Sequence, residues 1–389
     1  MTTAEIIQTE DRFQIPTYRK IPVALVRGEG TQVWDADGRR YLDFYGGHCV
    51  TLLGHAPPRV VRAIQDQAQH LIFYSNVVYS PVRARSAALL AKVAPEGMGR
   101  VFFCNSGTEA IEAALKIARK TTGRSGLIAM EGAFHGRTLG SLAATWNPAY
   151  REPFARVLRA AQFIPFGSLE AAAVALAQNP APAAVLLEPI QSIAGVMQAP
   201  DLYYQGLRRL CDEHGVVLIF DEIQTGVGRT GTFSISEQLG CTPDLITLAK
   251  SLGSGVPVGA VLVSEALSAK VEYGDQGSTF GGGMLAMAAV EATIATITEE
   301  NLMTRAGRIH EGIRAAVRGR VRAVRGRGCL IGLELHGETA PLLTALREHG
   351  VLAGGSGESN IMRLMPPLVT SDEDIDTFAD AFAHATRQL

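Results

Sequence analysis

Six short, uninterrupted apolar segments alternate with helical segments between residues 50 and 290, and this alternation constrains the fold most strongly. The apolar segments are residues 100–104, 127–130, 184–187, 216–220, 245–248 and 260–263. Helical periodicity occurs between them, for example over residues 110–120 and 201–214, and Gly215 follows as a typical helix stop. Strands that are apolar on both faces are typical of a mostly parallel sheet covered by helices. We therefore expect an α/β fold with its functional groups at the carboxyl ends of the strands.

The two ends of the chain follow a different pattern. Residues 32–34 and 41–44 flank an Asp-Ala-Asp-Gly turn, which indicates a β-hairpin. Near the other end, strands are expected around residues 329–335 and 361–364, and Ser371 begins a capping sequence for a final helix. Both ends together predict a smaller α+β domain.

The chain has 389 residues, which is more than one hydrophobic core usually supports. We expect a larger domain over residues 50–290. The smaller domain is expected to combine residues 1–49 with residues 291–389, after a long helical stretch that starts near Met284.

Composition and charge argue against several classes of protein. With 47% hydrophobic and 19% charged residues, the chain is typical of a globular protein. A net charge of -2 predicts neither nucleic-acid nor membrane binding. In the basic stretch 314–327, the alternation of Arg318, Arg320 and Arg322 with small or apolar residues indicates a solvated face. The five cysteines and nine histidines show no metal-type spacing, so no metal is expected. The N-terminus has no signal-peptide pattern, and a cytoplasmic location is expected.

Residues 102–109 read Phe-Phe-Cys-Asn-Ser-Gly-Thr-Glu, where a strand ends and a helix begins at once. The first turn of a helix presents free N–H groups and the positive end of its dipole, which suits a phosphate. The alternative is an ordinary helix cap by Ser106 or Thr108. The residues alone leave both interpretations open.

Two acids, Asp221 and Glu222, end the apolar segment 216–220, and burying them is costly without a cationic partner. A triphosphatase would present such acids to magnesium, but the chain has no Gly-x-x-x-x-Gly-Lys-Ser/Thr loop. A protonated pyridine nitrogen is another fitting partner. Residues 226–231 match Gly-x-Gly-x-x-Gly, but residues 221–225 separate them from the strand, which disfavours a dinucleotide site.

Lys250 follows the apolar segment 245–248 and precedes a glycine-containing loop. Most lysines are solvated surface charges. A lysine among small and apolar residues at the catalytic edge of a sheet is instead a candidate for imine chemistry, because burial lowers its pKa and frees the neutral amine. Residues 132–138 add an aromatic, Phe134, which could also belong to the core.

Taken together, five motifs resemble those of class III aminotransferases. They are Asn-Ser-Gly-Thr-Glu-Ala (105–110), Phe-His-Gly-Arg-Thr (134–138), Asp-Glu-Ile-Gln-Thr-Gly (221–226), Leu-Ala-Lys-Ser-Leu-Gly (248–253) and Gly-Ser-Thr-Phe-Gly-Gly (277–282). Within that class the chain is most similar to acetylornithine, acetyl-lysine and ornithine-type enzymes. The resemblance implies pyridoxal 5′-phosphate as cofactor and the fold type I architecture, with a mostly parallel seven-stranded sheet in the large domain and a smaller α+β domain. It also implies a homodimer that shares its active sites across the interface.

The resemblance further implies roles for the residues around the cofactor. Lys250 would hold the cofactor through an imine and later move the substrate proton. Asp221 would pair with the pyridine nitrogen so that the ring accepts electrons. Gln224 would bond to the 3-hydroxyl, and Phe134 would stack on the ring. The residues expected around the phosphate are Ser106, Gly107, Thr108 and Thr279 of the partner subunit.

For the substrate, the resemblance implies that Arg137 holds a carboxylate, since its planar fork suits that group. Ser278 and Arg363 would line the pocket. Three positions depart from the family pattern. The Gly-Gly-Asn-Pro that is common after the phosphate threonine is Gly281-Gly-Gly283-Met284 here, in the loop on the dimer side. Ile193 stands where relatives have a glutamate thought to neutralise the pocket arginine, and His48 stands where ornithine-type enzymes often have a tyrosine.

The predicted function is transfer of an amino group from an N-acetylornithine-like or other ω-amino donor to 2-oxoglutarate, by a ping-pong mechanism through Lys250. The alternatives are a decarboxylating transaminase or aminomutase of the same class, or an aminotransferase for 4-aminobutyrate or another hydrophobic ω-amine. Loss of catalysis is disfavoured, because Lys250 and Asp221 are both present.

Overall fold

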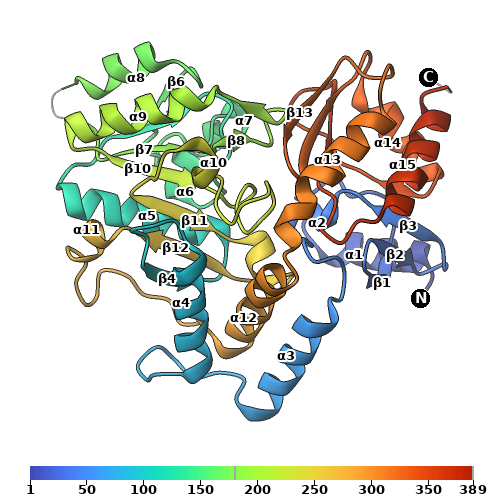
Figure 1. The fold of residues 1–389 in the computed structure, drawn as a ribbon, viewed down its shortest axis with the longest axis horizontal. Helices are drawn as coiled ribbons and strands as arrows, with labels where there is room; N and C mark the ends of the chain where they lie inside the picture. The colour runs from blue at the N-terminus through green and yellow to red at the C-terminus, as the bar shows by residue number, and fades with distance from the viewer. Residues whose placement is uncertain (179–180, 388–389) are drawn as a thin grey trace.

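A seven-stranded sheet forms the centre of the larger lobe in the computed structural model, which describes residues 1–178 and 181–387 (Figure 1). In spatial order the strands are β4 (Arg100–Cys104), β12 (Gly259–Val263), β11 (Leu245–Leu248), β10 (Val217–Asp221), β7 (Ala184–Leu187), β5 (Leu127–Met130) and β6 (Gln162–Ile164). Strand β12 is antiparallel to both neighbours, and the other adjacent pairs are parallel. The predicted mostly parallel sheet is confirmed, and β6 is a strand that the apolar segments did not predict.

Both faces of this sheet are covered, because successive side chains of a strand point to opposite faces. On β7, Leu186 packs into the core that contains the buried face of α5 (Gly107–Thr122). Its neighbour Leu187 packs into the opposite core, with α9 (Asp201–His214). Gly215 ends α9 in the left-handed conformation, as the sequence predicts.

The larger lobe contains further helices. They are α3 (Pro58–His70), α4 (Pro81–Val93), α6 (Leu139–Ala143), α7 (Pro148–Arg151), α8 (Leu169–Leu176), α10 (Ser236–Leu239), α11 (Glu265–Ser268) and α12 (Met284–Glu299). Helix α12 packs against α3 and α4 beside the smaller lobe (Figure 1). The predicted domain boundary at residues 290 and 291 falls inside α12. A two-stranded sheet of β8 (Ile190–Gln191) and β9 (Met197–Gln198) completes this lobe.

Strands from both ends of the chain share one sheet in the smaller lobe. Its order is β1 (Leu25–Glu29), β2 (Gln32–Asp35), β3 (Arg40–Asp43) and β15 (Val351–Leu352). The predicted hairpin is the antiparallel pair of β2 and β3, and β15 joins β3 in parallel. The second sheet contains β13 (Ala323–Arg327), β14 (Leu330–Glu334) and β16 (Ile361–Leu364).

The helices of the smaller lobe are α1 (Thr3–Phe13), α2 (Gly46–Cys49), α13 (Arg305–Ala316), α14 (Thr339–Glu348) and α15 (Asp372–Ala385). Ser371 caps α15 as predicted, and its hydroxyl accepts a hydrogen bond from the N–H of Asp374 at 3.1 Å. Within the described ranges, no helix is long and apolar enough to cross a membrane.

Arg318, Arg320 and Arg322 are exposed, as the predicted solvated face requires. The last part of the basic stretch 314–327 is β13, a half-buried strand that pairs antiparallel with β14. Arg325 forms an ion pair with Glu334 of β14, and Arg327 forms one with Asp201 of the larger lobe. These arginines therefore pair within the fold, through partners that are distant in sequence.

A second contact between the lobes comes from Arg229, whose side chain is completely buried. Its Nη1 donates to the carbonyl oxygens of Pro366 at 2.6 Å and Cys329 at 3.3 Å. Arg229 lies in the loop after β10, so this contact fixes the segment after β16 relative to the carboxyl end of the central sheet.

Candidate active site

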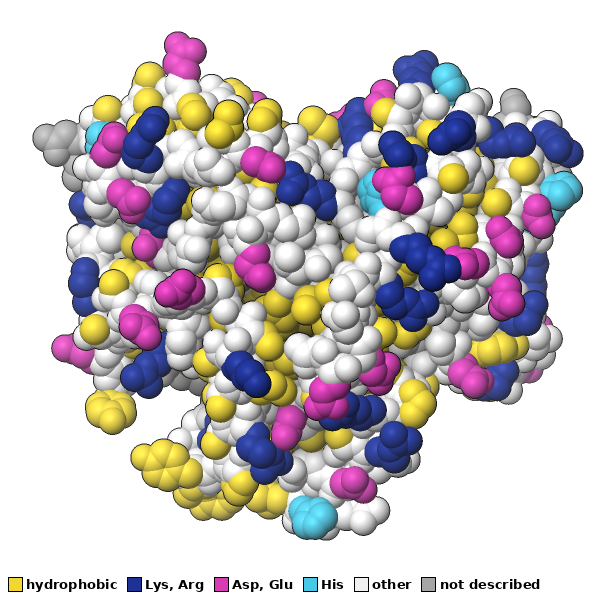
Figure 2. Space-filling model, viewed as in Figure 1, with side chains coloured by type: hydrophobic (Ala, Val, Ile, Leu, Met, Phe, Trp, Pro, Cys, Tyr) yellow, Lys and Arg dark blue, Asp and Glu magenta, His cyan; other side chains and the backbone are white. Residues whose placement is uncertain are grey.

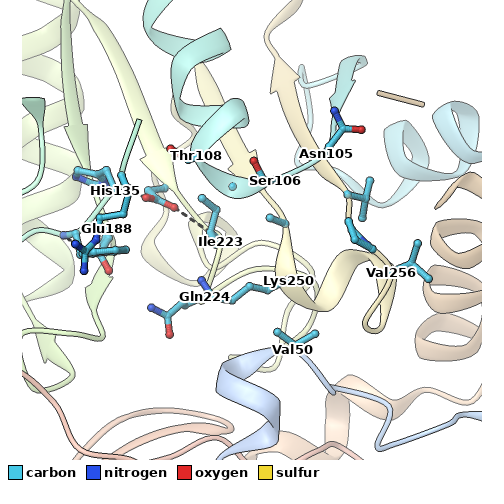
Figure 3. A pocket seen from close by; sticks show the side chains of 18 of the residues that line it. Val50, Asn105, Ser106, Thr108, His135, Glu188, Ile223, Gln224, Lys250 and Val256 are labelled. Carbon is cyan, nitrogen blue, oxygen red and sulfur yellow. Dashed lines mark hydrogen bonds and ion pairs between the residues drawn. The ribbon is translucent and has the colours of Figure 1, made fainter. Parts of the chain in front are cut away.

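A cavity of about 400 Å³ opens at the carboxyl ends of β10 and β11, beside the beginning of α5 (Figure 3). The predicted residues that line it are Ser106, Gly107, Thr108, Phe134, Arg137, Asp221, Gln224 and Lys250. In Figure 3, Lys250 and Gln224 lie between the start of α5 and Val50 of the smaller lobe. The parallel strands thus bring together residues from four of the five motifs at one edge of the sheet.

The start of α5 forms one wall of this cavity. Ser106 is the helix cap, and its hydroxyl accepts a hydrogen bond from the N–H of Glu109 at 3.3 Å. A Cβ atom at Gly107 would lie 2.7 Å from Cδ1 of Ile223, so a larger residue would force that side chain to move. The hydroxyl of Thr108 lies 2.7 Å from that of Ser141. The capping and anion-binding interpretations of this turn are therefore compatible.

Asp221 is the last residue of β10 and is buried. Its Oδ2 atom lies 2.7 Å from Nδ1 of His135, and its Oδ1 accepts from the N–H of Ile223 at 3.1 Å. His135 is also buried, and its Nε2 has no hydrogen-bond partner in the described structure. The carboxylate is therefore oriented at the cavity wall by a histidine that the sequence analysis did not select. The only sequence feature that points to His135 is its position next to Phe134.

Glu188 directly follows β7 and is a second buried acid at this edge of the sheet. Its Oε1 accepts a hydrogen bond from the N–H of Phe134 at 2.8 Å. Burial raises the pKa of Glu188 to about 7, against the opposing effect of His135. The motifs in the sequence predict no role for Glu188, although it directly follows an apolar strand, which is the same signal that identifies Asp221.

Lys250 begins a short 3-10 helix immediately after β11 and has a left-handed φ of 43°. Burial lowers the pKa of Lys250, while the negative charges of Asp221 and Glu188 act in the opposite direction. Nearby, Oε1 of Gln224 is buried without a hydrogen-bond partner among the described residues. The cavity therefore contains an amine with a lowered pKa and an amide oxygen that can accept a hydrogen bond from a ligand.

Arg137 is exposed on the cavity rim. Its guanidinium lies 3.6 Å from the ring centroid of Tyr150 and 5.6 Å from that of Phe134. Stacking of this kind orients the plane of the guanidinium and leaves its N–H groups free to bind a planar anion.

A second cavity, of about 420 Å³, adjoins the first, and both are lined by Phe134. Ile193 and Arg363 line this second cavity. Arg363 is 3% exposed, and it donates from Nε to the carbonyl of Gly355 at 2.6 Å and from Nη1 to the hydroxyl of Ser192 at 3.0 Å. Burial lowers the pKa of Arg363, and no acid of the described chain forms an ion pair with it.

Three predicted residues lie outside both cavity linings. The hydroxyl of Ser278 accepts from the side chain of Asn105 at 3.1 Å, and Thr279 is exposed on its own chain. His48 has a left-handed backbone and bonds through Nδ1 to the hydroxyl of Tyr45. Burial lowers the pKa of His48 to about 4, and the charges of Arg363 and Lys250 add to this effect. In the part of the chain that is described, no group of three or more His, Cys, Asp or Glu residues could hold a metal ion.

The sequence pattern of the family "aminotransferase class-III" matches residues 13–386. The chain is a class III aminotransferase. It is 43% identical to the acetylornithine aminotransferase of Methanopyrus kandleri, with 97% of each chain covered. It is 39% identical to the LysW-aminoadipate semialdehyde transaminase of Deinococcus radiodurans, over 97% of this chain and 89% of that one.

Among solved structures, this aminotransferase is similar to an ornithine aminotransferase from Toxoplasma gondii, which was described with pyridoxal phosphate at its active site. The TM-score is 0.94 at 29% identity, over 100% of this chain and 94% of that chain. The enzymes of the family depend on pyridoxal phosphate, and this aminotransferase is a pyridoxal-phosphate-dependent transaminase.

Proposed function

We propose that this aminotransferase moves an amino group from an N-acetylornithine-like or other ω-amino donor to 2-oxoglutarate in two half-reactions, with Lys250 as the catalytic amine. The observation that supports this most directly is the single cavity that Lys250, Asp221 and the beginning of α5 line together. The similarity to the acetylornithine aminotransferase of Methanopyrus kandleri supports the donor class.

The cavity fits pyridoxal phosphate on several independent grounds. The start of α5 would hold the phosphate, and Gln224 has a buried Oε1 that would accept from the ring hydroxyl. Asp221, oriented by His135, would keep the ring nitrogen protonated, and Phe134 would cover the ring. When bound, the cofactor supplies an electron sink for the bond that breaks at the amino-bearing carbon of the donor.

Lys250 would act as both attachment point and proton carrier. Its lowered pKa favours the neutral amine, which can attack a carbonyl and accept the proton that leaves the donor carbon. The position of Lys250 directly after a buried strand limits where that amine can lie, so proton transfer would be confined to one side of the cavity.

Two arginines would bind the substrate carboxylates. Arg137 lines the first cavity, and Arg363 lies in the second without an ion-pair partner among the described acids. Glutamate and 2-oxoglutarate each carry two carboxylates, which matches the two cations. Ile193 adds an apolar wall beside Arg363, which would suit a donor with an acylated or hydrophobic tail.

We also propose that the aminotransferase is a homodimer. Hydrophobic side chains gather at the lower edge of Figure 2, where the segment between α3 and α4 lies. The exposed members of this patch are Leu71, Ile72, Phe73, Tyr74, Val77, Val78, Tyr79 and Phe280. The ring centroids of Phe73 and Phe280 lie 5.1 Å apart, with the ring planes tilted by 50°. A hydrophobic patch of this kind is typical of a subunit interface. Thr279 adjoins Phe280, so dimerisation would carry Thr279 of the partner subunit towards the phosphate site.

A half-reaction assay tests the proposed activity. Glutamate alone should convert the absorbance of the loaded enzyme to that of its amino form without releasing carbon dioxide. Donors assayed with 2-oxoglutarate should then show the highest kcat/KM for an N-acylated diamino acid. Release of carbon dioxide would instead favour a decarboxylating enzyme, and no spectral change with any amino donor would contradict the proposed transfer.

A further inference from the structure

The second cavity contains an acid as well as Arg363. Glu358 lines this cavity, and its side chain is exposed, whereas Arg363 is buried. The carboxylate of Glu358 forms no hydrogen bond or ion pair within the described chain. A carboxylate in this state can accept hydrogen bonds from a ligand that enters the cavity.

The loop that carries Glu358 is attached to the residues that line the rest of the cavity. Gly354 and Arg363 exchange two backbone hydrogen bonds, of 3.1 and 2.7 Å. The N–H of Gly357 donates to the carbonyl of Ile193 at 2.7 Å. Within the loop, the hydroxyl of Ser356 accepts from the N–H of Glu358 at 3.1 Å. The backbone of Glu358 is therefore held in a definite position relative to both Arg363 and Ile193.

The side chain of Glu358 also has a defined path. The side chain of Glu358 passes over Gly195. If residue 195 had a Cβ atom, that atom would lie 3.3 Å from Cγ of Glu358. Gly195 belongs to the same short segment as Ile193, and its φ of 91° favours glycine. Glycine at this position leaves room for the glutamate beside the cavity.

The cavity thus offers three kinds of contact: a buried cation, apolar walls that include Ile193 and Trp146, and the acceptor Glu358. Each contact selects a different chemical group. The cation selects a carboxylate, the walls select an aliphatic group, and the acceptor selects an N–H donor. An N-acylated amino carboxylate carries all three groups on neighbouring atoms.

We propose that Glu358 is a specificity-determining residue that accepts a hydrogen bond from an N–H group in the distal part of the amino donor. This inference rests on the proposed aminotransferase activity and narrows its donor class. The N–H group belongs to an acylated amine, whose acyl part contacts Ile193. The alternative donor of this hydrogen bond is the free ammonium group of an unacylated diamino acid.

The test compares two donors of nearly the same shape in half-reactions of the loaded enzyme. The first is N-acetylornithine, and the second is its analogue in which an ester oxygen replaces the amide N–H. We expect the wild type to prefer the amide by about tenfold in kcat/KM, because the ester leaves Glu358 without its donor. Glu358→Leu should bring this ratio close to one, and Glu358→Gln, which keeps an acceptor oxygen, should retain part of it.

Glu170→Gln is the matched control, because Glu170 is an exposed acid at the start of α8 and lines neither cavity. Glu170→Gln should leave the amide-to-ester ratio at the wild-type value.

Free ornithine tests the alternative that the N–H belongs to an ammonium group. A larger loss of kcat/KM for ornithine than for N-acetylornithine in both Glu358 variants would assign the N–H to an ammonium group and overturn the acyl assignment. An unchanged amide-to-ester ratio in an active Glu358→Leu enzyme would overturn the role of Glu358. If the wild type converts none of these donors and does not react with glutamate, the proposed function itself fails.

Discussion

His135 Nδ1 lies 2.7 Å from Asp221 Oδ2, and both side chains are buried where the central sheet meets the cavity. An aspartate held by a buried histidine has one fixed orientation and remains available to a cationic ring nitrogen through its other lone pairs. Phe134, the residue before His135, lines the same cavity. One short segment therefore places both the aromatic side chain and the support for the acid.

Replacement of Lys250 by alanine should abolish turnover and leave an enzyme that still binds pyridoxal phosphate noncovalently. The phosphate, stacking and Asp221 contacts would remain when the covalent link is lost. Turnover and the spectrum of the bound cofactor are measured in the variant. Borohydride reduction of the wild type, followed by peptide mapping, should label Lys250, and a label on another lysine would contradict the assignment.

Asp221→Asn should lower kcat by about a hundredfold or more, equivalent to roughly 2.7 kcal/mol in the transition state, because the ring loses its stabilising anion. Glu222→Gln is the matched control. The carboxylate of Glu222 accepts from the Ser234 hydroxyl and the Ile235 N–H, and the residue does not line the cavity. Single-turnover rates with glutamate separate the two variants, and near-normal rates for Asp221→Asn would show that another group fills this role.

Ile193→Glu should weaken the half-reaction with glutamate by ~1–3 kcal/mol, because the new carboxylate would pair with Arg363 in a desolvated cavity. The same change should improve the relative activity with free ornithine. Ile193→Leu is the control for side-chain volume. The measurement is kcat/KM for both donors, and an unchanged value for glutamate would mean that Arg363 does not hold the second carboxylate.

Burial raises the pKa of Glu222 to about 7 from its ordinary 4.5. Between these values the folded protein keeps a proton that the unfolded chain releases, so rising pH lowers the free energy of unfolding. This loss of stability is complete once the pH exceeds the pKa of Glu222 in the folded protein. Glu222→Gln lacks this titration, so the stability of the wild type relative to the variant should fall between about pH 5 and about pH 8. Denaturant unfolding at several pH values measures this difference, and parallel curves for the two proteins would contradict it.

Local sequence determined the central sheet and most of the cofactor cavity. The segments 100–104, 127–130, 184–187 and 245–248 are strands with the predicted bounds, because an apolar run flanked by turns can be buried on both faces. Asp221 could be placed at the cavity because the carboxyl ends of parallel strands share one edge. The position of Lys250 at the cavity could be predicted by the same rule, because Lys250 follows β11.

Tertiary structure decided the partners that lie far apart in the chain. Strand β15 pairs with β3, and β13, which is not among the strands expected from the sequence, pairs with β14. In the same way, the orientation of Asp221 depends on His135, 86 residues away. The position of Glu358 depends on backbone bonds to Ile193 and Arg363. Hydrophobic periodicity records which residues are buried, but it contains no information on which distant group meets them, since that depends on how the complete chain closes around its cores.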